Sequence, residues 1–403
     1  MRKQPLQSSD FYISPEMCLL LLCCINKPSA QDYEKIQELV RGTLDWALFY
    51  KLVVRHRVYS IVYKNLKNVH CVEINRAVMS DLEKIDKQSR MKILLLYVTE
   101  LTRLMKCFGE QDIRAISIKG PVLSLLLYND ISQRMSKDLD ILVCQTDVAK
   151  AEQILVSKGY TREGEVSDLT DKQRAVLLKI AHHFSYINRK TGMNVEIHWK
   201  FNYESYNFNF EEMWAEKSEV TLAGVRIYIL NQEENFLYLV FHGAKHMWAR
   251  VKWLCDIAEL IKNDSLDWDY ISRRAKKLGI EHLFSQTLIL SSLLFGTDPH
   301  YELLKKRTGH PVFRMVQLAM DIILSTDYDP SHPDTRFYWT QKMYMFLWNA
   351  GLAKKLSFIK FHFYPTENDF AQIKLTDRYF SMYFLVRLSL VLKRKWKKFC
   401  DRG

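Results

Sequence analysis

The chain has 403 residues, of which 48% are hydrophobic and 26% are charged, and its 58 Lys and Arg against 46 Asp and Glu give a formal net charge of +12. This composition excludes a disordered or fibrous protein, and the length predicts two or three globular domains. The basic balance favours a polyanionic partner, such as a nucleotide, a nucleic acid or an anionic membrane face, without choosing among them.

The eight cysteines form no CxxC pair and match no zinc-site spacing, which favours buried thiols in a reducing cytosol. The N-terminus lacks the apolar core of a signal peptide. Its apolar run over residues 17–25 is too short to cross a bilayer, and no other stretch reaches the necessary length. We therefore expect a cytoplasmic protein.

Residues 1–111 are predicted to form a helical N-terminal region, because apolar residues recur at helical spacing from Leu39 to Val53 and from Ile93 to Leu104. Residues 112–232 are predicted to form an α/β core. One of its helices is expected over residues 122–128. A second helix is expected to begin after a cap at Thr146 or Asp147 and to end at Lys158. Its strands are expected over residues 113–118, 138–143, 184–188, 194–199, 219–222 and 225–230.

The chain beyond residue 232 is predicted to be helical again. We expect one helical domain over residues 233–300 and a helical C-terminal region over 301–403, which ends in a basic tail. The basic residues 393–398 of that tail favour either peripheral contact with an anionic membrane surface or a solvated helix end.

Two aspartates lie on the predicted strand 138–143. Because alternate residues of a strand face the same side, Asp138 and Asp140 point the same way, about 7 Å apart. Paired carboxylates repel each other unless a cation lies between them, and magnesium prefers carboxylate and phosphate oxygens. The alternative is that both are solvated residues of an exposed face. Asp is disfavoured in strands, however, so the pair favours a metal site.

The second strand of the predicted hairpin adds a third acid. Within residues 195–199 the apolar side chains share one face, and Glu196 and His198 share the other. If this strand lies beside the aspartate strand, Glu196 joins the cluster, and three acids can hold two metals around a phosphoryl displacement. Glu196 is then also a candidate general base toward an acceptor hydroxyl.

Five groups of residues between 85 and 300 complete the pattern. They are Ile118-Lys119-Gly120-Pro121, Leu127-Tyr128 with residues 134–143, Gly159-Tyr160, Val195-Glu196-Ile197-His198-Trp199 and His242-Gly243-Ala244-Lys245-His246. In combination they resemble an uncharacterised nucleotidyltransferase family of the DNA polymerase β-type nucleotidyltransferase superfamily. The resemblance implies an α+β fold, in which a small sheet of the polymerase β type is embedded between helical N- and C-terminal regions.

The resemblance also implies a chemistry. Asp138, Asp140 and Glu196 are expected to be catalytic and to bind Mg²⁺, with Mn²⁺ as an alternative, and a nucleoside triphosphate (NTP) is expected to be the donor. The acceptor is expected to be a peptide, a sugar or a small molecule, because members of the family tend to accompany pathways for modified peptides and cell-surface polymers.

The turn after the first strand departs from the superfamily pattern. The superfamily usually has Gly-Ser there, whose backbone N–H and hydroxyl hold the triphosphate, whereas this chain has Gly120-Pro121. Pro121 offers neither group. We expect Lys119, Gly120 and the first turn of the following helix to substitute for them.

Further nucleotide-binding and orienting residues are expected near the acids. Arg134 and Ser136 precede the aspartates and are expected to reach phosphates, although a solvated loop is the alternative. His183 and His198 are expected to orient the metal ligands or the substrate rather than to bind zinc, because the cysteines of a zinc site are missing.

Residues 242–256 are predicted to form one helix whose broad polar face closes the nucleotide cleft. His242, Lys245 and Lys252 are expected to bind the nucleotide, and Trp248 or Trp253 is expected to face its base. The alternative is a helix-packing face on which Lys252 and Asp256 form an ion pair.

Three functions follow, in this order. The first is an enzyme that transfers a nucleoside monophosphate from MgNTP to a hydroxyl or phosphate and releases pyrophosphate. The second is a catalytically weak regulatory module that holds a nucleotide on the same fold, which the Gly120-Pro121 turn favours. The third is a nucleic-acid-binding protein; it ranks last because no basic-aromatic motif accompanies the positive charge.

Overall fold

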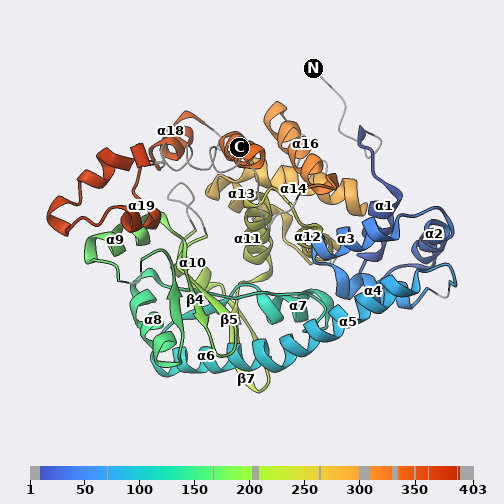
Figure 1. Cartoon of the computed structure of the whole chain (residues 1–403), viewed down its shortest axis with the longest axis horizontal. Coiled ribbons are helices and arrows are strands. Elements are labelled where there is room, and N and C mark those ends of the chain that lie inside the picture. The colour runs from blue at the N-terminus through green and yellow to red at the C-terminus, as the bar shows by residue number, and fades with distance from the viewer. Residues whose placement is uncertain are drawn as a thin grey trace.

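A computed structural model describes residues 10–69, 71–166, 168–201, 208–262, 265–298, 309–328, 335–348, 351–361, 363–387 and 389–390. Helices surround one seven-stranded sheet (Figure 1), so the α+β class is confirmed. The basic residues 393–398 lie outside the described part of the chain. Among the described helices, none has both the length and the apolar character that crossing a membrane requires.

The N-terminal helices form a bundle at one side of the molecule. They are α1 (Pro15–Cys23), α2 (Ala30–Arg41), α3 (Trp46–His56) and α4 (Tyr59–Lys67). The side chains of Ser14, Ser29 and Asp45 accept a backbone N–H at the first turn of α1, α2 and α3, which fixes where these helices begin.

A long helical run joins this bundle to the sheet. It consists of α5 (Arg76–Lys92), a π-helical turn η2 (Ile93–Tyr97) and α6 (Val98–Glu110), which follow one another beneath both parts in Figure 1. Tyr97, Leu101 and Phe108 are fully buried against the sheet. The run therefore supports the core of the sheet with its second half.

The seven strands are β1 (Ala115–Ser117), β2 (Leu139–Val143), β3 (Thr161–Glu163), β4 (His183–Asn188), β5 (Met193–His198), β6 (Ser218–Leu222) and β7 (Val225–Ile229). Their order in the sheet is β3-β4-β5-β2-β1-β7-β6. The pairs β2–β5 and β1–β7 are parallel, and the other neighbours are antiparallel. The hairpin β4–β5 turns through Gly192, whose φ of 66° suits a residue without Cβ.

The helices among the strands are α7 (Gly120–Tyr128), α8 (Val148–Ser157), α9 (Asp171–Ile180) and α10 (Phe210–Ala215). The predicted side-chain cap of α8 is wrong. A short 3-10 turn, η3 (Gln145–Asp147), precedes the helix, the Asp147 side chain makes no capping hydrogen bond, and the Thr146 hydroxyl donates to Cys144 instead. The 3-10 turn takes up the residues that a capping motif would occupy.

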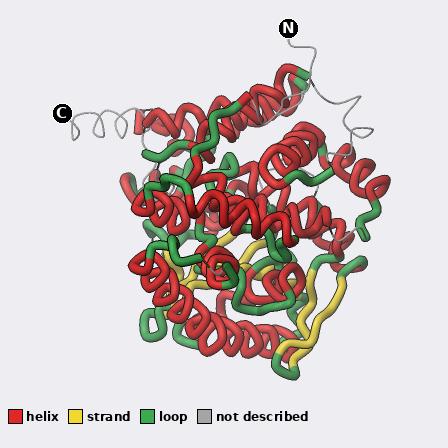
Figure 2. The backbone as a smooth tube through the Cα atoms, turned by 90° about the vertical axis from the view of Figure 1, so that its right-hand side faces the viewer, coloured by secondary structure: helices red, strands yellow, loops and turns green. Residues whose placement is uncertain are grey.

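The helices after the sheet stack above it, as Figure 2 shows from a second direction. They are α11 (Gln232–Lys245), α12 (Val251–Lys262), α13 (Trp268–Leu278), α14 (Glu281–Phe295), α16 (His310–Leu324), α17 (Thr335–Trp348), α18 (Leu352–Phe361), α19 (Glu367–Gln372) and the 3-10 turn η4 (Asp377–Tyr379).

The single helix predicted over residues 242–256 is wrong, because the chain breaks between α11 and α12. Met247 and Trp248 have positive φ values of 49° and 55°. Their backbone N–H groups donate to the carbonyls of Ala244 and Gly243, which is the pattern of a Schellman helix end. The Trp248 ring folds back onto Gly243, where a Cβ would overlap it. The Trp248 ring thus occupies space that is open only because residue 243 is a glycine.

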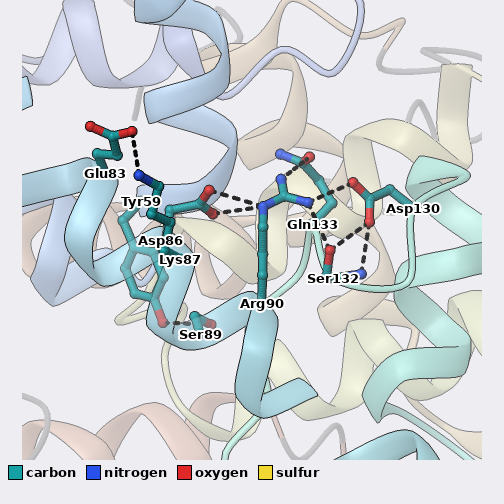
Figure 3. Close-up of polar contacts among 9 residues, drawn as sticks. All are labelled: Tyr59, Glu83, Asp86, Lys87, Ser89, Arg90, Asp130, Ser132 and Gln133. Atoms are coloured by element: carbon teal, nitrogen blue, oxygen red, sulfur yellow. Dashed lines mark hydrogen bonds and ion pairs between the residues drawn. The ribbon is translucent and has the colours of Figure 1, made fainter. Parts of the chain in front are cut away.

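Arg90 on α5 forms hydrogen bonds to the loop between α7 and β2 (Figure 3). The Arg90 guanidinium donates to Asp86 on its own helix, and across the gap to Asp130 at 2.9 Å, to Ser132 at 2.7 Å and to Gln133 at 3.3 Å. Arginine can bridge these acceptors because its planar guanidinium carries five donors. The loop that precedes β2 is thereby held in place from the N-terminal side.

Candidate functional site

Two of the three predicted acids are direct neighbours in the sheet. Asp140 on β2 and Glu196 on β5 are Cα partners in a parallel register. Asp138 comes immediately before β2 and is half-buried, whereas Asp140 is buried. All three carboxylates line one cleft with a volume of about 470 Å³.

The cleft lies between the sheet and the helices α11 and α12. From the sheet side and the loops next to it, the lining residues are Lys119, Arg134, Ser136, Lys137, Asp138, Asp140, His182, His183, Glu196, His198 and Phe201. From the helical side they are Tyr238, Phe241, His242, Lys245, His246, Ala249, Arg250, Lys252 and Trp253. With Arg57, seven Lys and Arg residues line the cleft beside three carboxylates, so the cleft has a formal net positive charge that suits a polyanionic ligand.

Asp140 is held between two nitrogen donors. Its Oδ1 atom lies 2.6 Å from Lys119 Nζ and 3.1 Å from His198 Nε2. Burial acts to raise the pKa of Asp140, but the Lys119 ammonium and the His198 imidazole together lower that pKa well below its usual value. Asp140 is therefore ionised throughout the physiological range.

Burial and neighbouring groups shift the pKa values of the other two carboxylates, Asp138 and Glu196. Burial and the neighbouring Asp140 raise the pKa of Asp138. Burial also acts to raise the pKa of Glu196, but the hydrogen bond from His198, at 3.1 Å, lowers it overall. Three buried or half-buried carboxylates that repel one another, with hard oxygen donors, form a ligand set that fits Mg²⁺.

Gly120 is the first residue of α7, where the chain turns out of β1, and it has a φ of 75°. A non-glycine residue would be strained there. Pro121 sits in the first turn of α7, where its missing N–H removes no helical hydrogen bond. Ser136, in the loop before β2, is buried and lines the cleft. Ser136 is thus a hydroxyl-bearing residue of the cleft that comes from a different loop than Gly120-Pro121.

Arg134 lines the cleft, but its Nε atom is already engaged. It donates to both oxygens of Asp256 on α12, at 2.8 and 3.0 Å, and Tyr128 also donates to Asp256. Lys252 instead donates to the Met135 carbonyl at 3.3 Å. The expected alternative of a Lys252–Asp256 ion pair is therefore wrong, because the carboxylate of Asp256 is taken by Arg134.

The helical wall presents an aromatic and imidazole surface. The ring of His246 stacks on Trp253 at 5.1 Å, and His242 meets Trp253 edge-on at 5.4 Å. Trp248, in contrast, is fully buried beneath Gly243 and does not line the cleft. Of the two tryptophans proposed to face a base, only Trp253 has access to the cleft.

Lys245 reaches across the cleft to the sheet. Its Nζ atom donates to His182 Nε2 at 2.6 Å. Burial and the nearby Lys119 ammonium lower the pKa of Lys245 to about 8. Burial likewise lowers the pKa of His183 to about 3, so its imidazole is neutral near pH 7.

Several further residues that line the cleft were not singled out from the sequence. Arg57 follows α3, and Arg250 lies in the break between α11 and α12. Tyr328 lies in the segment after α16, and Phe337 and Gln341 lie on α17. Tyr328 and Phe337 are stacked at 4.4 Å. Only tertiary packing brings these distant segments to the cleft, so a local motif could not have indicated them.

A family model described as an uncharacterised nucleotidyltransferase matches residues 42–296. This match spans α3 to α14, and so includes every strand of the sheet and both helices of the cleft wall. No curated protein and no solved structure matches the chain significantly.

Proposed function

The chain belongs to this uncharacterised nucleotidyltransferase family, and on that premise we propose that it transfers a nucleoside monophosphate from an NTP to an acceptor hydroxyl or phosphate and releases pyrophosphate. The observation that carries the proposal is the register of β2 and β5, which brings Asp140 and Glu196 side by side with Asp138 adjacent. Carboxylates from two strands in one basic cleft suit metal-assisted phosphoryl chemistry.

The three acids would hold the divalent cation, for which Mg²⁺ fits the oxygen donors and Mn²⁺ is the alternative. When bound, the cation supplies Lewis-acid stabilisation of the phosphate oxygens. Lys119 and Lys245 have ammonium groups beside these acids and are placed to contact phosphates, and Lys252 lines the same cleft. The stacked pair His246 and Trp253 offers an apolar surface for a nucleobase.

The transfer itself requires a proton acceptor. A Glu196 carboxylate oxygen takes the proton of the acceptor hydroxyl, and the acceptor oxygen forms a bond to the α-phosphorus. The bond between the α-phosphorus and the bridging oxygen to the β-phosphate breaks, and pyrophosphate leaves with the electron pair. Glu196 is suited to this task because it stays ionised, with its pKa lowered by His198.

A second candidate is a module on the same fold that binds the nucleotide with little turnover. The Gly120-Pro121 turn favours it, because Pro121 carries neither the hydroxyl nor the N–H that the superfamily places there. The two candidates share the nucleotide-binding step and differ only in pyrophosphate release.

The test uses the full chain with each of the four NTPs and Mg²⁺. We expect one NTP to raise the melting temperature, because a ligand at a hundred times its Kd stabilises the folded state by about 2.7 kcal/mol. Pyrophosphate release is then measured against a panel of peptides, sugars and small hydroxylated molecules. Binding with no release across the panel favours the second candidate, and no binding of any NTP contradicts both.

A further inference from the structure

Two histidines and two carboxylates meet on one face of three neighbouring strands. His183 on β4 and His198 on β5 are Cα partners, and so are Glu196 on β5 and Asp140 on β2. The imidazole rings lie with their centroids 4.9 Å apart. Because strands of a sheet fix the spacing of their side chains, these four groups form a built cluster and not a chance encounter of surface loops.

The facing atoms of the cluster are closely spaced. His198 Nε2 lies 3.1 Å from both Asp140 Oδ1 and Glu196 Oε2, and His183 Nε2 lies 3.7 Å from Glu196 Oε1. One donor atom each from His183, Glu196 and His198 falls within 4.8 Å of the others. The Nδ1 atoms of both rings are buried without a hydrogen-bond partner among the described residues, so Nε2 is the nitrogen that each ring turns toward the carboxylates.

These spacings match the edges of a metal coordination shell. With bonds of about 2.1 Å to a transition metal, adjacent ligand atoms lie about 3.0 Å apart in octahedral geometry and about 3.4 Å apart in tetrahedral geometry. The distances of 3.1 Å and 3.7 Å bracket the tetrahedral value and approach the octahedral one. The third edge, between the ligand atoms of His183 and His198, is within 4.8 Å, so the side chains must move toward a shared cation to complete the set.

We infer that one cation position of this site takes a first-row transition-metal dication, with His183, Glu196 and His198 as its ligands. Imidazole nitrogen suits manganese, iron, cobalt and zinc, whereas magnesium prefers oxygen donors throughout. Asp138 and Asp140 line the same cleft and leave oxygen donors for Mg²⁺. The inference deepens the proposed function and rests on it, because it names the metal class that the same site takes.

The first test titrates the metal-free full chain with Co²⁺ and follows its visible absorption. The intensity of the bands reports a low coordination number, and their positions respond to nitrogen ligands. We expect one Co²⁺ per chain, not displaced by a tenfold excess of Mg²⁺. His183→Ala and His198→Ala are expected to weaken Co²⁺ binding by at least tenfold. His246→Gln changes a histidine of the opposite wall and is the matched control, with Co²⁺ affinity within threefold of the wild type. Unchanged affinity in either alanine variant overturns the inference.

A second test needs no variant and therefore holds even if the alanine variants fail to fold. Pulsed electron paramagnetic resonance of the Mn²⁺-loaded wild type is expected to show coupling to imidazole ¹⁴N. Bound Mn²⁺ that shows no ¹⁴N coupling overturns the inference. Both tests are run without nucleotide, so their failure leaves NTP binding and pyrophosphate release untouched. Conversely, a chain that binds Co²⁺ through the histidines but binds no NTP contradicts the proposed function alone.

Discussion

Asp140 and Glu196 face each other across a parallel strand pair, although α8, β3, α9 and β4 separate them along the chain. Their carboxylates are bridged by one atom, His198 Nε2, which lies 3.1 Å from each. The sheet therefore fixes both acids relative to each other, while Lys119 neutralises one of them. This arrangement makes the site a preorganised receptor for cations and phosphates.

Lys119 competes with a metal for Asp140. Replacing it in Lys119→Met removes the ammonium 2.6 Å from Asp140 Oδ1. We expect Mn²⁺ alone to bind several-fold more tightly, because a like charge leaves the site. Equilibrium dialysis or the free Mn²⁺ resonance signal measures this affinity. Lys119→Arg keeps the charge and is expected to match the wild type; weaker Mn²⁺ binding by Lys119→Met would falsify the competition.

The buried pair Arg134–Asp256 is expected to be a major contributor to stability. Asp256→Asn leaves the Arg134 guanidinium buried without its counter-charge, and a loss of about 3–5 kcal/mol in the free energy of unfolding is expected. Urea denaturation measures it. The double variant Arg134→Met with Asp256→Leu is expected to lose less than Asp256→Asn alone, since no buried charge remains.

An exposed ion pair supplies the matched control for this measurement. Lys87 and Glu83 are 2.8 Å apart on α5, with side chains that are 72% and 40% exposed (Figure 3). Glu83→Gln is expected to leave the unfolding midpoint unchanged, because solvent screens such pairs. A loss in Glu83→Gln equal to that in Asp256→Asn would mean that burial does not set the strength of these pairs.

The break between α11 and α12 depends on the absence of a side chain at Gly243. A methyl group there would overlap the Trp248 ring, so Gly243→Ala is expected to cost about 1–3 kcal/mol of stability through overpacking. Gly109→Ala, in helix α6, meets no atom within 4 Å and is expected to be neutral or slightly stabilising. Thermal denaturation of the two variants side by side decides the point, and equal melting temperatures would refute the role of Gly243.

NTP affinity is expected to fall as the pH rises above about 8. Burial lowers the pKa of Lys245 to about 8, so its ammonium is charged below that pH and neutral above it. A charged ammonium attracts a triphosphate and a neutral amine does not, so the association constant decreases by up to about tenfold per pH unit in this window. Isothermal titration calorimetry between pH 7 and 9.5 measures the profile.

Two substitutions show whether Lys245 is the titrating group. Lys245→Arg stays charged across the whole range, so its NTP affinity is expected to be independent of pH. Lys245→Gln is neutral throughout. It is expected to bind NTP weakly, with an affinity that is also independent of pH. If both variants retain the decline of the wild type, another group causes it.

The elements that the sequence predicted well are those with local signals. The strand that carries Asp140 and the hairpin that carries Glu196 are confirmed, because alternating apolar residues and Gly192 specify them locally. The sequence analysis assumed that these two strands pair and did not predict it. Local sequence patterns do not indicate a parallel contact between strands that are distant in the chain. The short edge strand β3 was not predicted at all.

The helical wall shows where sequence reasoning fails. The apolar period continues through residues 246–250, so it predicted one helix, yet the chain turns at Met247 and Trp248 with positive φ. Neither residue type signals that conformation. Gly243 was the available clue, since it leaves room for Trp248. Likewise, Lys252, four residues away on the same helix, was considered as an alternative partner of Asp256, whereas the actual partner is Arg134 from a distant loop.

The most direct test of the whole account measures how much Mg²⁺ tightens NTP binding, by calorimetry with and without the metal. We expect a large gain in affinity for the wild type and for Glu163→Gln, which changes an exposed acid on β3. Asp138→Asn, Asp140→Asn and Glu196→Gln are each expected to lose that gain. If the three variants keep the full Mg²⁺ dependence of the wild type, the acids do not hold the metal and the proposed site is wrong.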